Sequence, residues 1–325
     1  MCAGKRDDSV QSSSSQGHGN HRSNENKENF DTLIEEVMLG EEAMGPHGGH
    51  TGVLVTEKHH LKLKSYFWPS AKGLKPRGTF LFVHGHGAHL RFEVLAVTKP
   101  GSDPVYAGSW VEKMNQEGLN VCGIDLQGCG LSESLMGLRF YVESFDDYVD
   151  DVIHLALEVH GQPSPSSRVP EAFLGCPIFV GGVSMGGCIS FYAAQRRPDV
   201  FRGMVLLAPM LSLERVSRKG LNPYLKPLAS IASWLVPSAA ILATDKNTVY
   251  PEIQALWDGD PLVSHIKTRV RNGHEYMRVT SEALKLMPMV ETDFIIFHSE
   301  CDTMCDPDGS KALFLKSRVG FKYCF

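Results

Sequence analysis

The sequence predicts an α/β fold with a mostly parallel central sheet and helices on both of its faces. Short apolar segments of strand length alternate along the chain with longer segments of helical periodicity, and this alternation is typical of a parallel sheet. Two of the apolar segments, residues 79–83 and 178–180, lead directly into glycine-rich turns. A chain of 325 residues with 42% hydrophobic content can also bury one large core.

The expected elements can be placed in order from about residue 51. The first two strands are expected to pair in antiparallel fashion, and the later strands to be separated by helices. The predicted strands cover residues 52–57, 61–68, 79–83, 119–124, 178–180, 203–208 and 293–297. Helices are expected at about 107–117 and at 145–160, where Ser144 is a suitable N-cap.

The turn after residue 180 carries a candidate nucleophile. Residues 182–186 read Gly-Val-Ser-Met-Gly, and a helical pattern follows them until Pro198. A serine on a tight strand-to-helix turn needs neighbours without bulk, because only then does its hydroxyl project freely. This context favours Ser184 as a nucleophile over an ordinary glycine-rich turn.

The turn after the strand at 79–83 supplies candidate donors for the charge that such a nucleophile would create. Attack on a carbonyl produces an oxyanion, which must be stabilised by hydrogen bonds. Residues 84–87 read His-Gly-His-Gly, where a turn of this kind is expected. We predict that the backbone N–H groups of His86 and Met185 form the oxyanion hole, each contributing about 3 kcal/mol.

The histidines of this turn permit a second interpretation. His84, His86 and His89 form the pattern H-x-H-x-x-H, a spacing that can bind zinc. Zinc hydrolases of the metallo-β-lactamase type carry an aspartate before the third histidine, where this chain has Ala88. We favour the oxyanion interpretation because it also accounts for Ser184. His84 is then expected to hydrogen-bond locally, His89 to face solvent, and the chemistry to need no metal or organic cofactor.

The third expected group is an acid after a later strand. Hydrolases with this serine turn place serine, acid and histidine in that order along the chain. The loop after residues 293–297 contains several carboxylates, of which we choose Asp302 as the one that would orient the base. Glu300, Asp306 and Asp308 are the alternatives, and they are expected to be solvated charges or a helix cap.

Four segments together resemble the α/β-hydrolases of the monoacylglycerol lipase and caffeoylshikimate esterase type, which are grouped with the serine aminopeptidase-like hydrolases. They are the His-Gly-His-Gly turn, residues 125–132 with the pattern D-x-x-G-x-G-x-S, the turn around Ser184, and residues 300–302 with the following 310–313. The resemblance covers about residues 51–313. It implies a serine esterase, with a monoacylglycerol or a related lipophilic ester as its substrate and phenolic esters as an alternative.

The sequence departs from this family at the catalytic base. The family places its histidine after one more strand beyond the acid, whereas no histidine follows His298 here. We expect the last strand and helix to be missing, most simply through truncation, and the chain as given to be poorly soluble. It should also be nearly inactive, because losing the base of a triad costs on the order of 10⁶ in turnover. Recruitment of His298, or a non-catalytic ligand-binding protein on this fold, are the alternatives.

A long segment, about residues 211–290, separates two of the predicted strands and is expected to form a lid. Residues 227–244 within it carry no charge and include several large apolar side chains. Serines and Pro237 interrupt this stretch, which disfavours a membrane-spanning helix. We expect it to wall an acyl pocket, with peripheral contact with a membrane as the alternative.

The net charge, the N-terminal residues and the cysteines indicate which partners and which cellular location to expect. A net charge of -5 gives no case for nucleic acid binding. Residues 1–28 are polar and serine-rich, and we expect a disordered tail there, ahead of a hydrolase domain at 51–325. That tail lacks the apolar core of a secretory signal, so we expect a cytoplasmic protein, peripheral to membranes at most, whose cysteines are free thiols. The sequence does not indicate an oligomeric state.

Overall fold

The computed structural model describes residues 39–161, 168–217, 230–242 and 246–325, and the expected tail at 1–28 lies outside this part of the chain. Its centre is an eight-stranded sheet in the order β1-β2-β4-β3-β5-β6-β9-β10. The pairs β1·β2 and β2·β4 are antiparallel, and all other neighbours are parallel. The strands are β1 (His50–Val55), β2 (Lys62–Trp68), β3 (Gly78–Val83), β4 (Leu119–Ile124), β5 (Ile178–Val183), β6 (Phe201–Leu207), β9 (Phe294–Phe297) and β10 (Lys322–Cys324). The predicted α/β fold is therefore confirmed, together with its antiparallel opening pair.

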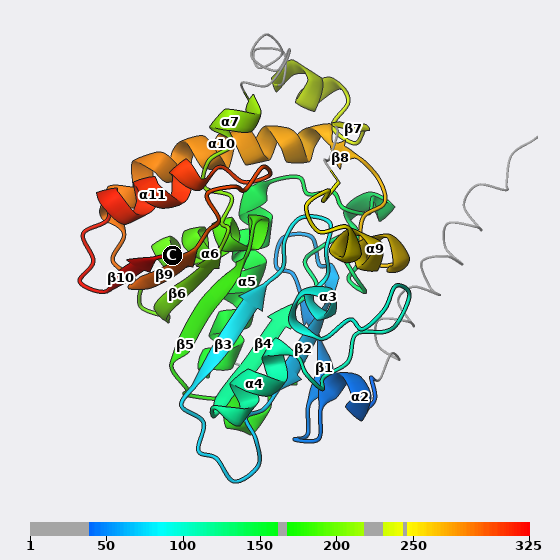
Figure 1. The fold of residues 1–325 in the computed structure, drawn as a ribbon, viewed down its shortest axis with the longest axis vertical. Coiled ribbons are helices and arrows are strands. Elements are labelled where there is room, and N and C mark those ends of the chain that lie inside the picture. The colour runs from blue at the N-terminus through cyan, green and yellow to red at the C-terminus, as the bar shows by residue number, and fades with distance from the viewer. Residues whose placement is uncertain (1–38, 162–167, 218–229, 243–245) are drawn as a thin grey trace, which may run out of the picture.

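Helices cover both faces of this sheet (Figure 1). The helices are α2 (Glu41–Met44), α3 (Leu90–Val94), α4 (Trp110–Gln116), α5 (Phe145–His160), α6 (Met185–Arg196), α7 (Glu214–Ser217), α9 (Pro251–Gly259), α10 (Val270–Leu286) and α11 (Pro307–Lys316). Short 3-10 turns lie at Leu135–Gly137, Glu171–Phe173 and Met287–Met289. One buried cluster joins α5, α6 and α10 to the sheet, and a second joins α2, α3 and α4 to it. The sheet therefore has a separate apolar core on each side.

The helix α5 starts where the sequence predicted and is held there by a capping box. The Ser144 hydroxyl accepts a hydrogen bond from the Asp146 N–H, and the Asp147 carboxylate accepts one from the Ser144 N–H at 3.3 Å. Such caps satisfy backbone donors that the first turn leaves unpaired. The cap fixes Asp147 in position, with its side chain only 6% exposed.

The pattern D-x-x-G-x-G-x-S has a structural explanation, because its aspartate joins three segments of the chain. Asp125 is fully buried and accepts hydrogen bonds from the Tyr66 hydroxyl and from the backbone N–H groups of Leu90 and Leu131, at 2.7–2.9 Å. A side chain at Gly130 would place its Cβ 2.2 Å from the Asp125 carboxylate, at a backbone φ of +49°. Only glycine fits that position.

The expected lid segment, about 211–290, consists of two different parts. Its later part, α10, contributes Tyr276, Val279 and Ala283 to the main core and crosses the upper end of the sheet in Figure 1. The earlier part contains a helical stretch at 230–235 and a small antiparallel sheet formed by β7 (Ala240–Leu242) and β8 (Thr268–Arg269). Within the described ranges, none of the helices is both long enough and apolar enough to cross a bilayer.

The expectation that no strand would follow Asp302 is wrong. After α11 the chain forms β10, which pairs in parallel with β9 and continues the sheet at that edge. Phe321, Tyr323 and Phe325 alternate along this segment, and their rings follow one another at centroid distances of 5.1 and 6.0 Å. Alternating aromatic residues favour a strand. The edge of β9 is therefore covered by β10. The strand that an aggregating partner could pair with is now β10, so the expected poor solubility depends on its exposed edge.

We predict that Tyr323→Lys reduces self-association of this chain. Among the described strands β10 forms one edge of the sheet, opposite β1, and Tyr323 is 49% exposed on it. A lysine on an exposed edge strand opposes pairing with a second chain. Light scattering at increasing concentration measures the effect, with Leu315→Lys as the control because Leu315 is 77% exposed but lies on α11. Equal scattering by both variants would contradict this role for the edge.

Candidate active site

Ser184 lies at a sharp corner between β5 and α6. Its backbone has φ 53° and ψ -115°, a conformation that residues other than glycine rarely adopt. The end of β3 approaches this corner so closely that the residues on either side of Val183-Ser184-Met185 have no room for a side chain. A Cβ at Gly182 or at Gly186 would lie 2.1 or 2.0 Å from the carbonyl oxygen of Val83. Both flanking glycines are therefore required by contact between two backbones.

The Ser184 hydroxyl has an unexpected partner, the thiol of Cys305. The distance between Oγ and Sγ is 3.3 Å, and either atom can be the donor. Cys305 is 5% exposed, and burial raises the pKa of its thiol to about 11, although the bond with Ser184 lowers it somewhat. The thiol is thus neutral at physiological pH and acts as a weak hydrogen-bonding group.

Asp302 lies in the same loop and is joined to this pair. Its Oδ1 accepts hydrogen bonds from the N–H groups of Met304 and Cys305, at 2.8 and 3.0 Å, and its Oδ2 lies 3.4 Å from Nε2 of His298. Burial alone would raise the pKa of Asp302, but the contacts with His298, Cys305 and Met304 outweigh it and hold that pKa below its ordinary value. The structure therefore brings Ser184 and Asp302 to a common neighbour, Cys305.

The alternative carboxylates have other partners. Glu300 forms an exposed ion pair with Lys311 at 2.8 Å. Asp306 caps α11 and pairs with Arg215 at 3.0 Å, and Asp308 pairs with the same arginine at 2.9 Å. Their positions match the expected roles as surface charges and a helix cap.

The turn at residues 84–87 reaches the same corner. A Cβ at Gly85 would lie 3.6 Å from the Cβ of Ser184. The Gly85 N–H donates to Oε1 of Glu93 at 3.0 Å, and burial raises the pKa of Glu93 to about 8, with that hydrogen bond opposing the rise. The N–H of Met185 is the first in α6, so no partner exists for it within the helix, and Ser184 provides no side-chain cap.

Tyr276 of α10 touches both residues that were predicted to form the oxyanion hole. Its hydroxyl forms a hydrogen bond with Nδ1 of His86 at 2.7 Å and lies 3.2 Å from the Met185 sulfur. The other ring nitrogen of His86, Nε2, forms a hydrogen bond with Oγ1 of Thr268 at 3.0 Å. Burial, and to a smaller extent His84, lowers the pKa of His86 to about 4, so the ring is neutral. No sequence pattern indicated Tyr276 beyond its place on an apolar helix face.

The other histidines of the H-x-H-x-x-H pattern are bound to separate partners. His84 donates from Nδ1 to the carbonyl of Gly85 and accepts from the N–H of Leu126 at Nε2, both at 2.9 Å, which agrees with the expected local role. His89 is fully buried, with Nε2 3.0 Å from Oδ2 of Asp260, so the expectation that it faces solvent is wrong. Asp260 lies in the expected lid segment, and a contact this remote leaves no local pattern in the sequence.

The predicted site also needs a base that accepts the proton of the Ser184 hydroxyl, and the described residues around Ser184 do not provide one. Over the described ranges, Cys305 is the hydrogen-bonding partner of the Ser184 hydroxyl, and no histidine ring bonds to it. His298, the expected alternative, uses Nδ1 for a 2.7 Å hydrogen bond with the Ser310 hydroxyl and faces Asp302 with Nε2. Its ring therefore stays within its own loop.

Comparison with known proteins finds a hydrolase family and lipases as relatives of this chain. A family profile described as serine aminopeptidase, S33, matches residues 101–320. The monoglyceride lipase of Rattus norvegicus is 27% identical over 247 residues, covering 74% of this chain and 71% of that protein, and the monoglyceride lipase of Mus musculus is 28% identical over 256 residues, covering 75% and 73%.

Solved structures show the same architecture. A crystal structure of monoacylglycerol lipase from Paleococcus ferrophilus has a TM-score of 0.63 at 20% identity and covers 81% of this chain and 87% of that one. A soluble variant of monoglyceride lipase from Saccharomyces cerevisiae, in complex with a substrate analog, has a TM-score of 0.64 at 18% identity and covers 84% of each chain. At these identities the likeness shows the fold alone.

We predict that Tyr276→Phe lowers the free energy of unfolding by about 1–3 kcal/mol, because it leaves the buried Nδ1 of His86 without its hydrogen-bonding partner. Urea unfolding followed by circular dichroism measures this change. Tyr323→Phe is the control, since that side chain is half exposed and should change stability little. An equal response of the two variants would show that the Tyr276 hydroxyl does not support the His86 turn.

Proposed function

The chain belongs to the serine aminopeptidase S33 family of hydrolases, whose profile matches more than half of its length, and from this premise we propose that it cleaves carboxylic esters through an acyl-enzyme at Ser184. The observation that carries the proposal is the corner at Ser184, which presents a hydroxyl beside the unpaired N–H at the start of α6. Nothing in this chemistry requires a metal or an organic cofactor.

The proposed reaction assigns a separate role to each group. The Ser184 oxygen attacks the ester carbonyl carbon while its proton passes to a base, and the carbonyl oxygen becomes an oxyanion held by the N–H groups of His86 and Met185. The alcohol then leaves with a proton, and water releases the acid from the serine in a second step of the same kind. Asp302 would orient the base, and Tyr276 would hold the His86 turn in position.

We further propose that this chain is nearly inactive as it stands. Proton transfer needs a group at the Ser184 hydroxyl, and the neighbour there is Cys305, whose neutral thiol is a poor base. Loss of the base in a serine triad costs on the order of 10⁶ in turnover, about 8 kcal/mol. The hydrogen bonds of His298 support a structural role for its ring.

The proposed substrate is a monoacylglycerol or a related lipophilic ester. The curated relatives named monoglyceride lipase support this choice. The exposed apolar side chains at 231–236 supply a surface that could receive an acyl chain or touch the lipid that carries it. A non-catalytic ligand-binding protein is the second candidate function, and it is favoured by the contact between the Ser184 hydroxyl and Cys305.

Acylation can be tested without a protein base by adding imidazole as the base together with a p-nitrophenyl ester. We expect the acyl group on Ser184, located by mass spectrometry of the digested protein, because the corner exposes this hydroxyl to the oxyanion donors. Ser184→Ala is the control and should carry no acyl group at that peptide. Acylation of other residues alone would contradict the proposed nucleophile.

The same preparation separates the two candidate functions. If no acyl-serine forms but a non-hydrolysable ether analogue of a monoacylglycerol binds saturably, the ligand-binding function replaces ester cleavage. If neither occurs with folded protein, both proposals fail.

We predict that the double variant Trp234→Ser, Leu235→Ser weakens binding to phosphatidylcholine vesicles by at least about tenfold, because two large apolar side chains no longer enter the interface. The two side chains are 78% and 62% exposed. Co-flotation with vesicles measures the binding. Trp110→Ser, which removes a tryptophan that is 55% exposed on α4, is the matched control. Equal losses in both variants would mean that binding is not localised to residues 230–236.

A further inference from the structure

A turn between two strands and the start of α5 bring together three potential metal ligands. His59 lies in the turn between β1 and β2, and Glu143 and Asp147 lie on either side of the Ser144 cap. Nε2 of His59 is 3.3 Å from Oδ2 of Asp147 and 3.6 Å from Oε2 of Glu143. The three ligand atoms all lie within 4.8 Å of one another, the one such group of three in the described residues.

The two separations from His59 are close to those of neighbouring ligands around a tetrahedral ion. Bonds of about 2.0–2.1 Å arranged tetrahedrally place neighbouring ligand atoms about 3.3–3.4 Å apart. The set contains one imidazole nitrogen and two carboxylates, which suits Zn²⁺ and similar transition ions better than Ca²⁺ or Mg²⁺, because those ions take oxygen ligands alone.

Two of the ligands are held in place before any ion binds. The capping box fixes Asp147, and the side chain of His59 is only 15% exposed. The turn that carries His59 is closed by a hydrogen bond from the Leu61 N–H to the Thr56 hydroxyl at 3.0 Å. An ion would therefore need to order only Glu143, whose side chain is 49% exposed.

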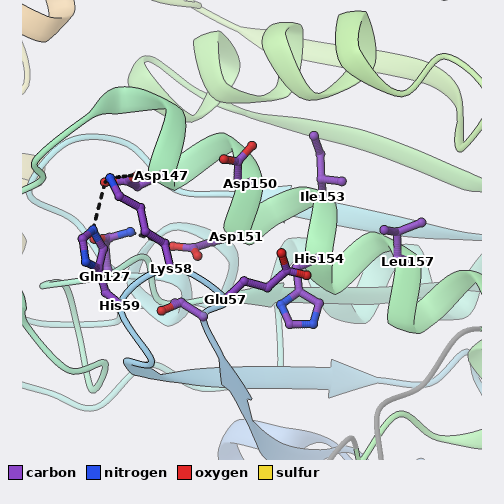
Figure 2. Close-up of a pocket in the computed structure, with 11 residues that line it drawn as sticks. Glu57, Lys58, His59, Gln127, Asp147, Asp150, Asp151, Ile153, His154 and Leu157 are labelled. Carbon is purple, nitrogen blue, oxygen red and sulfur yellow. Dashed lines mark hydrogen bonds and ion pairs between the residues drawn. The ribbon is translucent and has the colours of Figure 1, made fainter.

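The cluster borders a cavity of about 230 Å³ that contains a further oxygen ligand (Figure 2). Gln127 lines this cavity and is 1% exposed. Its amide nitrogen donates to Oδ2 of Asp151 at 2.9 Å, whereas its carbonyl oxygen is buried and has no partner within the described chain. A buried carbonyl oxygen without a donor is unusual, and a hydrated cation in the cavity would satisfy it.

Lys58 places a positive charge at the same carboxylates. Its ammonium lies 2.9 Å from Oδ1 of Asp147 and 3.3 Å from Oε2 of Glu143, as Figure 2 shows for Asp147. The Lys58 side chain is 55% exposed, so it can swing into solvent at little cost. The site thus already holds a cation, and a bound metal ion would replace the ammonium.

We propose that His59, Glu143 and Asp147 form a binding site for a divalent transition metal ion of the Zn²⁺ class, with Lys58 as a competing internal cation. The ion would join the β1–β2 turn to the start of α5, two segments that are 88 residues apart at His59 and Asp147. Binding to the folded state alone raises stability, so the consequence of occupancy is a stronger attachment of the sheet edge to α5. The site does not depend on the proposed chemistry at Ser184.

Zinc titration calorimetry of the full chain tests the proposal, in a Cys301→Ser, Cys324→Ser background that removes the thiols that are exposed among the described residues. We expect one equivalent of Zn²⁺ to bind and the melting temperature to rise by a few degrees. His59→Ala should abolish both effects. Lys58→Met should tighten binding roughly fivefold to tenfold, because the competing charge is gone.

His154→Ala is the matched control. His154 lines the same cavity but is outside the group of three, so this variant should bind Zn²⁺ like the unchanged protein. Absence of stoichiometric binding in both the unchanged and the Lys58→Met proteins would overturn the proposal. Binding that survives His59→Ala would also overturn it, since other residues would then be the ligands.

Discussion

The site depends on the contact between the end of β3 and the corner at Ser184. The carbonyl oxygen of Val83 lies so close to the corner that neither Gly182 nor Gly186 could carry a side chain. Ser184 itself has a φ of 53°, a strained conformation that costs about 1–3 kcal/mol and that the surrounding structure must hold in place. Because β3 also leads into the turn at 84–87, the same packing brings Gly85 of that turn beside Ser184. A change in register between β3 and β5 would therefore remove both features at once.

Residues far apart in the sequence complete the surroundings of this corner. Tyr276 approaches from α10, Cys305 from the loop after β9, and Glu93 from the start of the helical segment after β3. Each makes at least one hydrogen bond to a residue of the corner or of its neighbouring turn. The expected lid segment is thus not only a cover, because its last helix supports the turn that precedes the site.

The sequence predicted the parts of the protein that local patterns determine. The strands before Ser184 and Asp302, the cap at Ser144 and the parallel sheet could all be inferred, because glycine turns and apolar periodicity act over a few residues. Tyr276, Cys305 and the burial of His89 could not, because each depends on a partner about 90 to 190 residues away. The strand β10 has a local signal in its alternating aromatic residues, whereas the missing histidine indicated that this strand would be absent.

The N-terminal end of α6 affects how the product of the proposed reaction leaves the site. Twelve residues of helix point their N-terminal end at Ser184, with no side-chain cap between them. Such an end carries about half a positive charge and favours anions. The fatty acid that the proposed ester cleavage would release is a carboxylate, whereas the proposed substrate is neutral. The electrostatic field that would favour the reaction would therefore also retain the acid product. The acid would then leave this protein more slowly than the alcohol.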